Sequence, residues 1–383
     1  MEESNEKIQV SCSICDNADN ITKSEHSLSS EDQPLRIVSV NVNLMPSGAL
    51  SFLTSGTPEQ RASQLADFLL QNHGMHTDIF YIQELYHVNA SNVFKSKLDE
   101  AEFQPFEGPK AGIYNGLEYK YNSGQVIFMN KKRLKIDLHS QNNMPNVDEE
   151  TVPSEDQKST QTVKYTVTHL DSLAFPSYGI HGKGPLEKCV PKGAIWLRLN
   201  VKNINDNSEM EQQILDTYYL HLQSDPLALL YNFNPKQVRT DQIKPLKDYS
   251  VFNTKNVKIP HHNLFIGDFN IASNWNEFTS LNEFLNVAPV NDTKCVTIGC
   301  PSNTSHNPLV WKIGGILYDH YEAQLDHCLV SSSLKSNSVL KSSLEFGTFP
   351  LSTTKENRRV GGTPREEKSS LTDHEGIFVE LNF

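Results

Sequence analysis

Short runs of apolar, β-branched and aromatic residues recur along the chain, and most of them end in a polar side chain. Runs of about four to eight such residues, bounded by turn-forming residues, are typical of strands in a packed sheet. The pattern predicts strands at Leu35–Val42, Asp78–Leu85, Asn122–Met129, Ala194–Val201, Asp216–Leu222, Leu264–Ile266, Leu325–Val330 and Gly376–Leu381. Strands outnumber helices in this pattern.

Helical spacing of apolar residues is clearest after Thr57, which can cap a helix whose first turn holds Pro58 and Gln60. A threonine followed three residues later by glutamine is a capping box, and proline suits the first helical turn. Apolar residues three and four positions apart follow, and Gly74 is the expected end. Two further helices are predicted at Pro235–Ile243 and Asn276–Phe284.

The 383 residues fit one large α/β domain or two average ones. Residues 1–34 are rich in Ser, Glu, Asp and Asn, and they predict a disordered arm. We expect a single catalytic domain over 35–383, because strands resume after each polar interruption. The interruptions at about 141–162 and 331–370 are predicted to be inserted loops.

A formal net charge of -12 argues against a non-specific nucleic-acid binder, although a nuclease with a local basic patch stays possible. No run approaches the roughly 18 apolar residues of a membrane span, and the first residues do not resemble a secretory leader. We therefore expect a cytoplasmic protein with peripheral membrane association, or export by a route that the sequence does not show. A host-directed bacterial effector stays open, as does the pairing of Cys295 with Cys300.

The most informative polar strand end is Gly267-Asp268-Phe269-Asn270. Alternation places Asp268 and Asn270 on one face of the chain and Phe269 on the other, and Gly267 marks a sharp bend or a close approach. Two oxygen-bearing side chains displayed together suit a hard cation such as Mg²⁺, or the phosphate that it holds. A strand that runs into an Asx turn is the structural alternative.

Polar residues of the same kind stand at the ends of other predicted strands. The full set is Asn41, Glu84, Lys192, His221, Asp268, Asn270, Asp326, Asp373 and His374. Each has an ordinary alternative, since a lone strand-end histidine or carboxylate is more often a solvated side chain. If the two strands of the strand–helix–strand unit around the first helix pair directly, Asn41 and Glu84 lie at neighbouring strand ends. Repetition at strand after strand favours one shared site.

These residues resemble, in order and spacing, the motif set of the endonuclease/exonuclease/phosphatase superfamily. The matching segments are Asn41, Ile82-Gln83-Glu84, His221-x-Gln223, Gly267-Asp268-Phe269-Asn270, Leu325-Asp326 and Asp373-His374. The resemblance spans about 35–383. It implies a DNase-I-like, four-layered α/β sandwich in which two packed mixed, mainly antiparallel sheets are flanked by helices.

Within the superfamily, the chain is most similar to the neutral and bacterial sphingomyelinases. Lys192-Gly193 before a strand, His221-Leu222-Gln223 and Val238-Arg239-Thr240-Asp241-Gln242 carry this similarity. Glu187 stands five residues before Lys192, where sphingomyelinases typically carry aspartate. The resemblance implies that Glu187 regulates Lys192 by pairing with it.

Phosphodiester cleavage needs a positioned water, neutralisation of charge at phosphorus and help for the leaving oxygen. Glu84, with Asn41 nearby, can hold Mg²⁺, for which Mn²⁺ or Co²⁺ are possible substitutes, and Asp373 is expected in the outer shell. His374 suits a general base because histidine titrates near neutral pH. The superfamily resemblance implies that Asp326 orients it.

The remaining residues are expected to handle the phosphate. Asp268 and Asn270 would position water or phosphate, His221 would stabilise the phosphoryl oxygens, and Lys192 would reach the substrate phosphate as a point charge. The expected reaction is hydrolysis of sphingomyelin to ceramide and phosphocholine at a membrane surface. Trp196 is one of several aromatic candidates for the choline group. The alternatives are a nuclease of the same superfamily and a catalytically idle binding module; the oligomeric state is not predicted.

Overall fold

The structure is a computed structural model that describes residues 34–44, 57–114, 117–138, 165–175, 190–202, 212–224, 234–254, 259–290, 324–331, 344–349, 352–357, 365–370, 372 and 374–381. The expected arm over 1–34 and the expected loop over 141–162 lie almost entirely outside these residues, so the domain boundaries stay a prediction. The part from Pro34 onward forms one compact unit. Among its described helices, none combines the length and the apolar character needed to cross a membrane.

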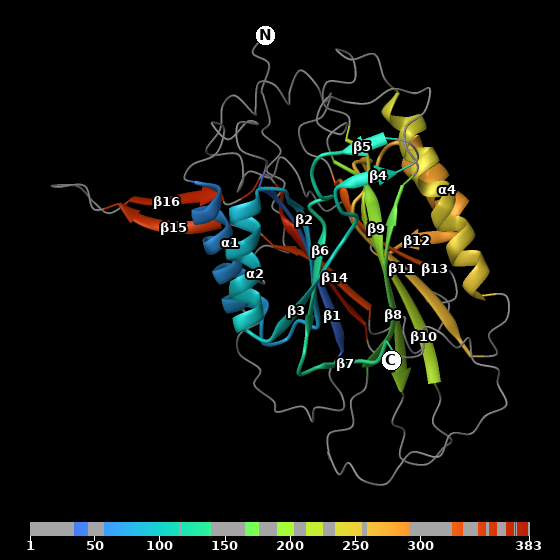
Figure 1. Cartoon of the computed structure of the whole chain (residues 1–383), viewed down its shortest axis with the longest axis horizontal. Helices are drawn as coiled ribbons and strands as arrows, with labels where there is room; N and C mark the ends of the chain where they lie inside the picture. The colour runs from blue at the N-terminus through green and yellow to red at the C-terminus, as the bar shows by residue number, and fades with distance from the viewer. Residues whose placement is uncertain are drawn as a thin grey trace, which may run out of the picture. The chain divides into compact units, whose positions relative to one another are not determined.

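The first sheet has six strands in the order β14-β17-β1-β2-β6-β3 (Figure 1). Its members are β1 (Leu35–Leu44), β2 (Ile79–Leu85), β3 (Phe103–Glu107), β6 (Val126–Asn130), β14 (Leu344–Phe349) and β17 (Gly376–Leu381). The central pair β1 and β2 is parallel, and the other pairs are antiparallel.

The second sheet has seven strands in the order β12-β13-β11-β10-β9-β8-β7. Its members are β7 (Leu134–Ile136), β8 (Tyr165–Ala174), β9 (Gly193–Lys202), β10 (Gln212–His221), β11 (His261–Asp268), β12 (Val287–Pro289) and β13 (Asp326–Ser331). The pairs β10–β11 and β7–β8 are parallel, and the rest are antiparallel. Two small hairpins, β4 (Gly112–Tyr114) with β5 (Leu117–Tyr119) and β15 (Ser352–Asn357) with β16 (Arg365–Ser370), stand apart from both sheets.

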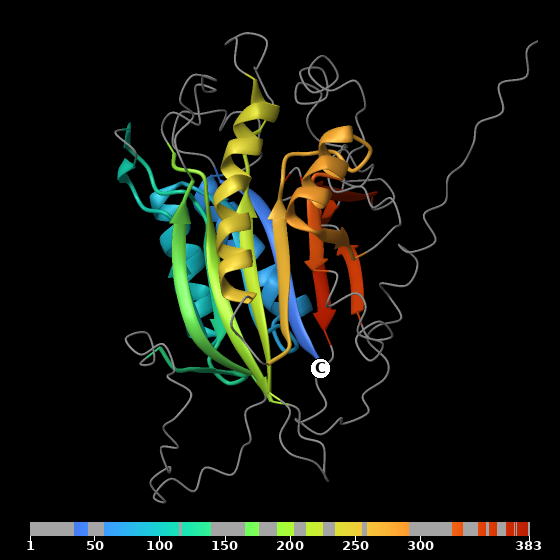
Figure 2. The ribbon, with the colours of Figure 1, turned by 90° about the vertical axis from the view of Figure 1, so that its right-hand side faces the viewer.

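Within the described residues, four helices cover the outer faces of the sheets. Helices α1 (Pro58–His73) and α2 (Val88–Glu100) lie against the first sheet, and α4 (Pro235–Thr254) and α5 (Asn276–Leu285) lie against the second (Figures 1 and 2). Three separate apolar clusters fill the spaces between these layers. Tyr81 and Ile195 belong to the cluster between the sheets, whereas Phe80 faces α1 and α2, and Phe265 faces α4 and α5. The expected four-layered sandwich is therefore confirmed.

The strand at each predicted position occurs, with shifted ends, and the first helix begins with the expected capping box between Thr57 and Gln60. The predicted stop at Ile243 is wrong, because α4 continues through Pro245 to Thr254. Proline removes one helical hydrogen bond. The next residue, Leu246, is fully buried against the second sheet, and this packing favours continuation of the helix.

Helix α2 was not predicted, because its sequence begins with the weak helix formers Val88 and Asn89. Its buried residues Ala90, Phe94 and Leu98 are four positions apart, a signal that is too short to stand out. The stretch 331–370, expected to be a loop, contributes β14 to the first sheet and carries the β15–β16 hairpin.

Candidate active site

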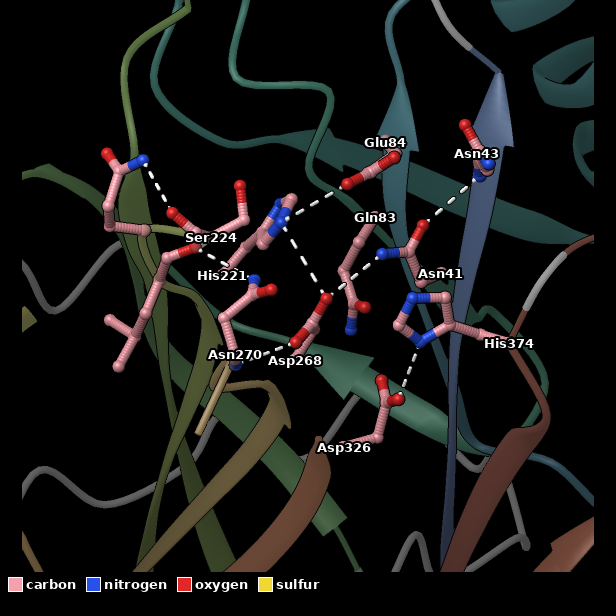
Figure 3. Close-up of polar contacts among 12 residues, drawn as sticks. Asn41, Asn43, Gln83, Glu84, His221, Ser224, Asp268, Asn270, Asp326 and His374 are labelled. Atoms are coloured by element: carbon pink, nitrogen blue, oxygen red, sulfur yellow. Dashed lines mark hydrogen bonds and ion pairs between the residues drawn. The ribbon is translucent and has the colours of Figure 1, made fainter. Parts of the chain in front are cut away.

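Polar side chains from both sheets meet where the central parallel strands end (Figure 3). The carboxyl ends of parallel strands lie at the same edge of a sheet. In the first sheet, Asn41 is paired with Gln83, the neighbour of Glu84; in the second, Asp268 is paired with His221. The two edges touch, because Asn41 Nδ2 donates a hydrogen bond to Asp268 Oδ2 at 3.1 Å. The predicted neighbourhood of Asn41 and Glu84 is confirmed.

His374 and Asp326 form a buried pair at one side of this site. His374 Nδ1 lies 2.8 Å from Asp326 Oδ2, and the side chains are 7% and 1% exposed. Thr372, which the sequence analysis missed, donates from Oγ1 to the backbone oxygen of Asn41 at 2.7 Å and accepts from His374 N at 3.4 Å. This hydroxyl attaches the segment that carries His374 to the end of β1. Its only sequence signal is its place two residues before the histidine.

Asp268 lies at the centre of the site, and both of its carboxylate oxygens accept hydrogen bonds. Its Oδ2 accepts from Asn41 Nδ2, and its Oδ1 accepts from the backbone N–H of Asn270 at 2.8 Å. Burial, followed by the charge of Asp326, raises the pKa of Asp268 to about 7. Asp268 is therefore a carboxyl whose charged form is costly in the metal-free protein.

Gly267 permits the approach of this strand to its neighbours. Its φ is +136°, and a Cβ atom there would lie 2.1 Å from the Leu220 backbone oxygen and 2.8 Å from Tyr81 Cε1. Neither contact is sterically possible, so only glycine fits. The predicted close approach at Gly267 is confirmed. Phe269, on the opposite face, is buried in the cluster beneath α4 and α5, as alternation predicts.

The raised pKa of Asp268 predicts a pH-dependent stability difference. A carboxyl with a pKa near 4 when unfolded and about 7 when folded favours folding most at low pH, and this contribution is lost as pH rises through that interval. In EDTA, the free energy of unfolding of Asp268→Asn relative to the wild type should therefore increase between about pH 4 and pH 7. Urea unfolding at several pH values measures this, and a pH-independent difference would contradict it.

His221 joins three charged groups across the two sheets. Its Nε2 lies 2.9 Å from Lys192 Nζ, 3.5 Å from Glu84 Oε1 and 3.9 Å from Asp268 Oδ2. Burial, the Lys192 ammonium and His374 hold the pKa of His221 well below its usual value. A neutral ring can accept a hydrogen bond from the Lys192 ammonium at Nε2. The site therefore places a cation and a neutral imidazole beside two carboxylates.

Backbone strain is concentrated at this edge. Asn43, Glu84 and Asn270 have φ values of 45°, 59° and 53°. Asparagine tolerates this left-handed region, but for glutamate it costs roughly 1 to 2 kcal/mol. Such strain persists where the surroundings over-determine the conformation, which is common at functional sites. It turns the Glu84 side chain, 21% exposed, toward His221.

The donor atoms fit a hard cation. Ligand atoms of Glu84, His221 and Asp268 lie within 4.8 Å of one another, as do those of Asp268, Asp326 and His374. Carboxylate oxygens, with the amide oxygen of Asn41 at the same edge, are the ligands that Mg²⁺ prefers. The residues present therefore suit magnesium.

The structure brings together eight of the predicted site residues: Asn41, Glu84, Lys192, His221, Asp268, Asn270, Asp326 and His374. Asp373 and Glu187 lie outside the described residues, so their roles stay predictions. Trp196 does not belong to the site. Its ring packs in the cluster beneath α4, stacks with Tyr218 and lies tilted against His169, so a role for Trp196 in choline binding stays a prediction.

Comparison of the sequence with protein-family models and with curated proteins finds no match. Solved structures do match. Beta toxin from Staphylococcus aureus, in a double mutant with bound magnesium ions, is 16% identical with a TM-score of 0.57, and the match covers 91% of this chain and 99% of the toxin.

Two further structures are similar over the same span. Sphingomyelinase C from Streptomyces griseocarneus is 15% identical with a TM-score of 0.52, covering 91% of this chain and 99% of that one. An endonuclease/exonuclease/phosphatase family protein from Bacteroides thetaiotaomicron is 13% identical with a TM-score of 0.52, covering 91% and 98%. Because these two different proteins match with the same TM-score, similarity of fold does not identify the substrate of this chain. The chain has the DNase-I-like fold of the endonuclease/exonuclease/phosphatase superfamily.

Proposed function

We propose that this protein is a magnesium-dependent phosphodiesterase that hydrolyses sphingomyelin to ceramide and phosphocholine. One observation carries the hydrolase assignment: the buried His374–Asp326 pair, with the carboxylate of Asp268 within 4.8 Å of both. A histidine oriented by a carboxylate, beside polar groups that can hold a phosphate, is the arrangement that general-base hydrolysis needs.

In the proposed reaction, His374 is the general base. Its Nδ1–H donates to Asp326, so Nε2 is left with the lone pair that takes a proton from water. The water oxygen forms a bond to phosphorus in line with the departing ceramide oxygen. The bond from that oxygen to phosphorus breaks, and the oxygen takes up a proton from solvent to become the hydroxyl group of ceramide. Asp268 and Asn270 position the water or the phosphate during this attack.

In the proposed mechanism, residues across the site from His374 stabilise the negative charge on the phosphoryl oxygens. His221 and the Lys192 ammonium, 2.9 Å apart, lie where they can contact these oxygens. Bound Mg²⁺ supplies further charge neutralisation, and Glu84 with Asn41 would hold it. Asp373 is proposed for the outer shell of the metal, and Glu187 for regulation of Lys192.

The choice of sphingomyelin is supported by the Lys192-Gly193 and His221-Leu222-Gln223 segments, which resemble the sphingomyelinase branch. The contact between Lys192 and His221 joins these two segments in space. The net charge of -12 disfavours the nuclease alternative, because nucleic acid repels an acidic surface. The expected partner is a phospholipid at a membrane surface.

A panel of substrates tests this proposal. The purified protein with Mg²⁺ is offered sphingomyelin, lysophospholipids, phosphoinositides and single-stranded DNA side by side. We expect turnover of sphingomyelin with release of phosphocholine, and a rate about 10²- to 10⁴-fold lower in the His374→Ala protein prepared in the same way. Cleavage of DNA without turnover of any lipid would replace the lipid assignment by the nuclease alternative.

A further inference from the structure

The two residues that follow His221 have every backbone polar group bonded, although they lie beyond the end of β10. Leu222 N donates to the Asp268 backbone oxygen at 3.0 Å, and Leu222 O accepts from Asn270 Nδ2 at 3.1 Å. Gln223 N donates to Gln242 Oε1 at 3.0 Å, and Gln223 O accepts from Arg239 Nη1 at 2.9 Å. Although this segment lies outside the sheet, each of its backbone N–H and C=O groups has a hydrogen-bond partner, as in a strand inside a sheet.

The last two of these bonds come from one face of α4. Arg239 and Gln242 are three residues apart, so their side chains are neighbours on the helix surface. One presents a guanidinium to the carbonyl of Gln223 and the other an amide oxygen to its N–H. Both side chains are buried, and Gln242 is fully so. Side chains of α4 therefore bond both the N–H and the C=O of Gln223.

Arg239 is itself held by α5. Its Nε and Nη2 donate to Glu277 Oε1 and Oε2, each at 2.8 Å, and its side chain is 1% exposed. A bidentate, charge-assisted pair fixes the orientation of the guanidinium plane as well as its position. Glu277 lies in the first turn of α5, where the helix dipole favours a carboxylate. The direction of the bond to Gln223 is thereby set by two helices.

We propose that Arg239, Gln242 and Glu277 are positioning residues of the candidate active site. The hydrogen bonds of these three residues given above go to one another and to the backbone of Gln223. They act through the Leu222–Gln223 backbone, which continues directly from His221 and accepts the bond that orients the Asn270 carboxamide. A displacement of about 1 Å in such groups can cost on the order of 10²-fold in rate. The kinetic part of this inference rests on the proposed hydrolase function.

The competing explanation is an ion pair that only joins α4 to α5. Such a pair would affect the melting temperature alone, whereas a positioning role also changes kcat in the fully folded protein. Arg133 provides a matched control. It makes a similar bidentate pair with the buried Asp78, at 2.7 and 3.1 Å, near the beginning of β2 and away from the strand ends that form the site.

The experiment compares Arg239→Lys and Gln242→Met with Arg133→Lys. Lysine keeps the charge but lacks the planar fork, and methionine keeps the approximate volume of glutamine but replaces the amide oxygen by a sulfur that is only a weak acceptor. At temperatures well below melting, we expect both site variants to lower kcat about tenfold or more, with a smaller change in KM. Arg133→Lys should lower the melting temperature and leave kcat within about twofold.

A second readout does not depend on turnover. The imidazole ¹³C–¹H signal of His221, identified by its loss in His221→Gln, should shift in Arg239→Lys and Gln242→Met, while that of His169 stays in place. If the wild type cleaves no phosphodiester, the proposed function fails, and the His221 signal still decides the positioning role. Unchanged kcat together with an unchanged His221 signal in both variants would overturn the inference. If Arg239→Lys does not fold, the result for Gln242→Met alone decides whether these residues position the site.

Discussion

Replacing His374 with alanine is expected to lower kcat for phosphodiester hydrolysis by about 10²- to 10⁴-fold, the usual loss on removal of a general base. The reason is the geometry of the pair, in which Asp326 occupies Nδ1 and leaves Nε2 to accept the proton of water. Steady-state kinetics and circular dichroism measure the loss and check that the protein stays folded. The surface variant His76→Ala, which removes an exposed histidine, is the control.

The same pair predicts a non-additive double mutant. In the proposed mechanism Asp326 affects the rate by orienting His374, so Asp326→Asn added to His374→Ala should reduce kcat little further. The acidic limb of the pH–rate profile should disappear with His374→Ala, because it reports protonation of the base. Losses that multiply would show that the two residues act separately, and wild-type kcat in His374→Ala would exclude the general-base role.

Removal of the divalent cation is expected to abolish turnover, and replacement of Glu84 should prevent its recovery. EDTA strips the metal, and Mg²⁺ should restore the wild type but leave Glu84→Ala at least about 10²-fold below it, since Glu84 is the solvent-reachable carboxylate of the donor set. Titration calorimetry of Mg²⁺ binding gives a measurement that does not rely on a substrate.

A carboxylate outside the site serves as the control for this second prediction. Glu118 is exposed on the β5 strand of a separate hairpin, and Glu118→Ala should bind Mg²⁺ and turn over substrate as the wild type does. Full activity of the wild type in EDTA would refute the metal requirement. Wild-type Mg²⁺ affinity in Glu84→Ala would remove Glu84 from the ligand set.

The sequence by itself located eight strands of the two sheets and the polar residues that end them, but it did not predict β3, β7, β8, β12 or β14. Strand patterns are local: an apolar run such as Leu35–Val42 must be buried, and the residue after it meets the edge of the sheet. The predicted pairing of β1 with β2 followed from one short crossover helix with a clear cap at Thr57. Gly267 in the sequence predicted a close approach between neighbouring backbones, because glycine, which has no Cβ, tolerates such an approach best.

Only the tertiary structure decided which residues from separate strands touch. The bond from Asn41 to Asp268 spans two sheets, and the hold of Thr372 on the end of β1 joins segments far apart in the chain. The support of Gln223 by Arg239 likewise depends on the approach of α4 to the end of β10. These contacts follow from packing between layers, which no local pattern encodes. Packing also overrode the local stop signal at Pro245, because burial of the next leucine favoured the longer helix.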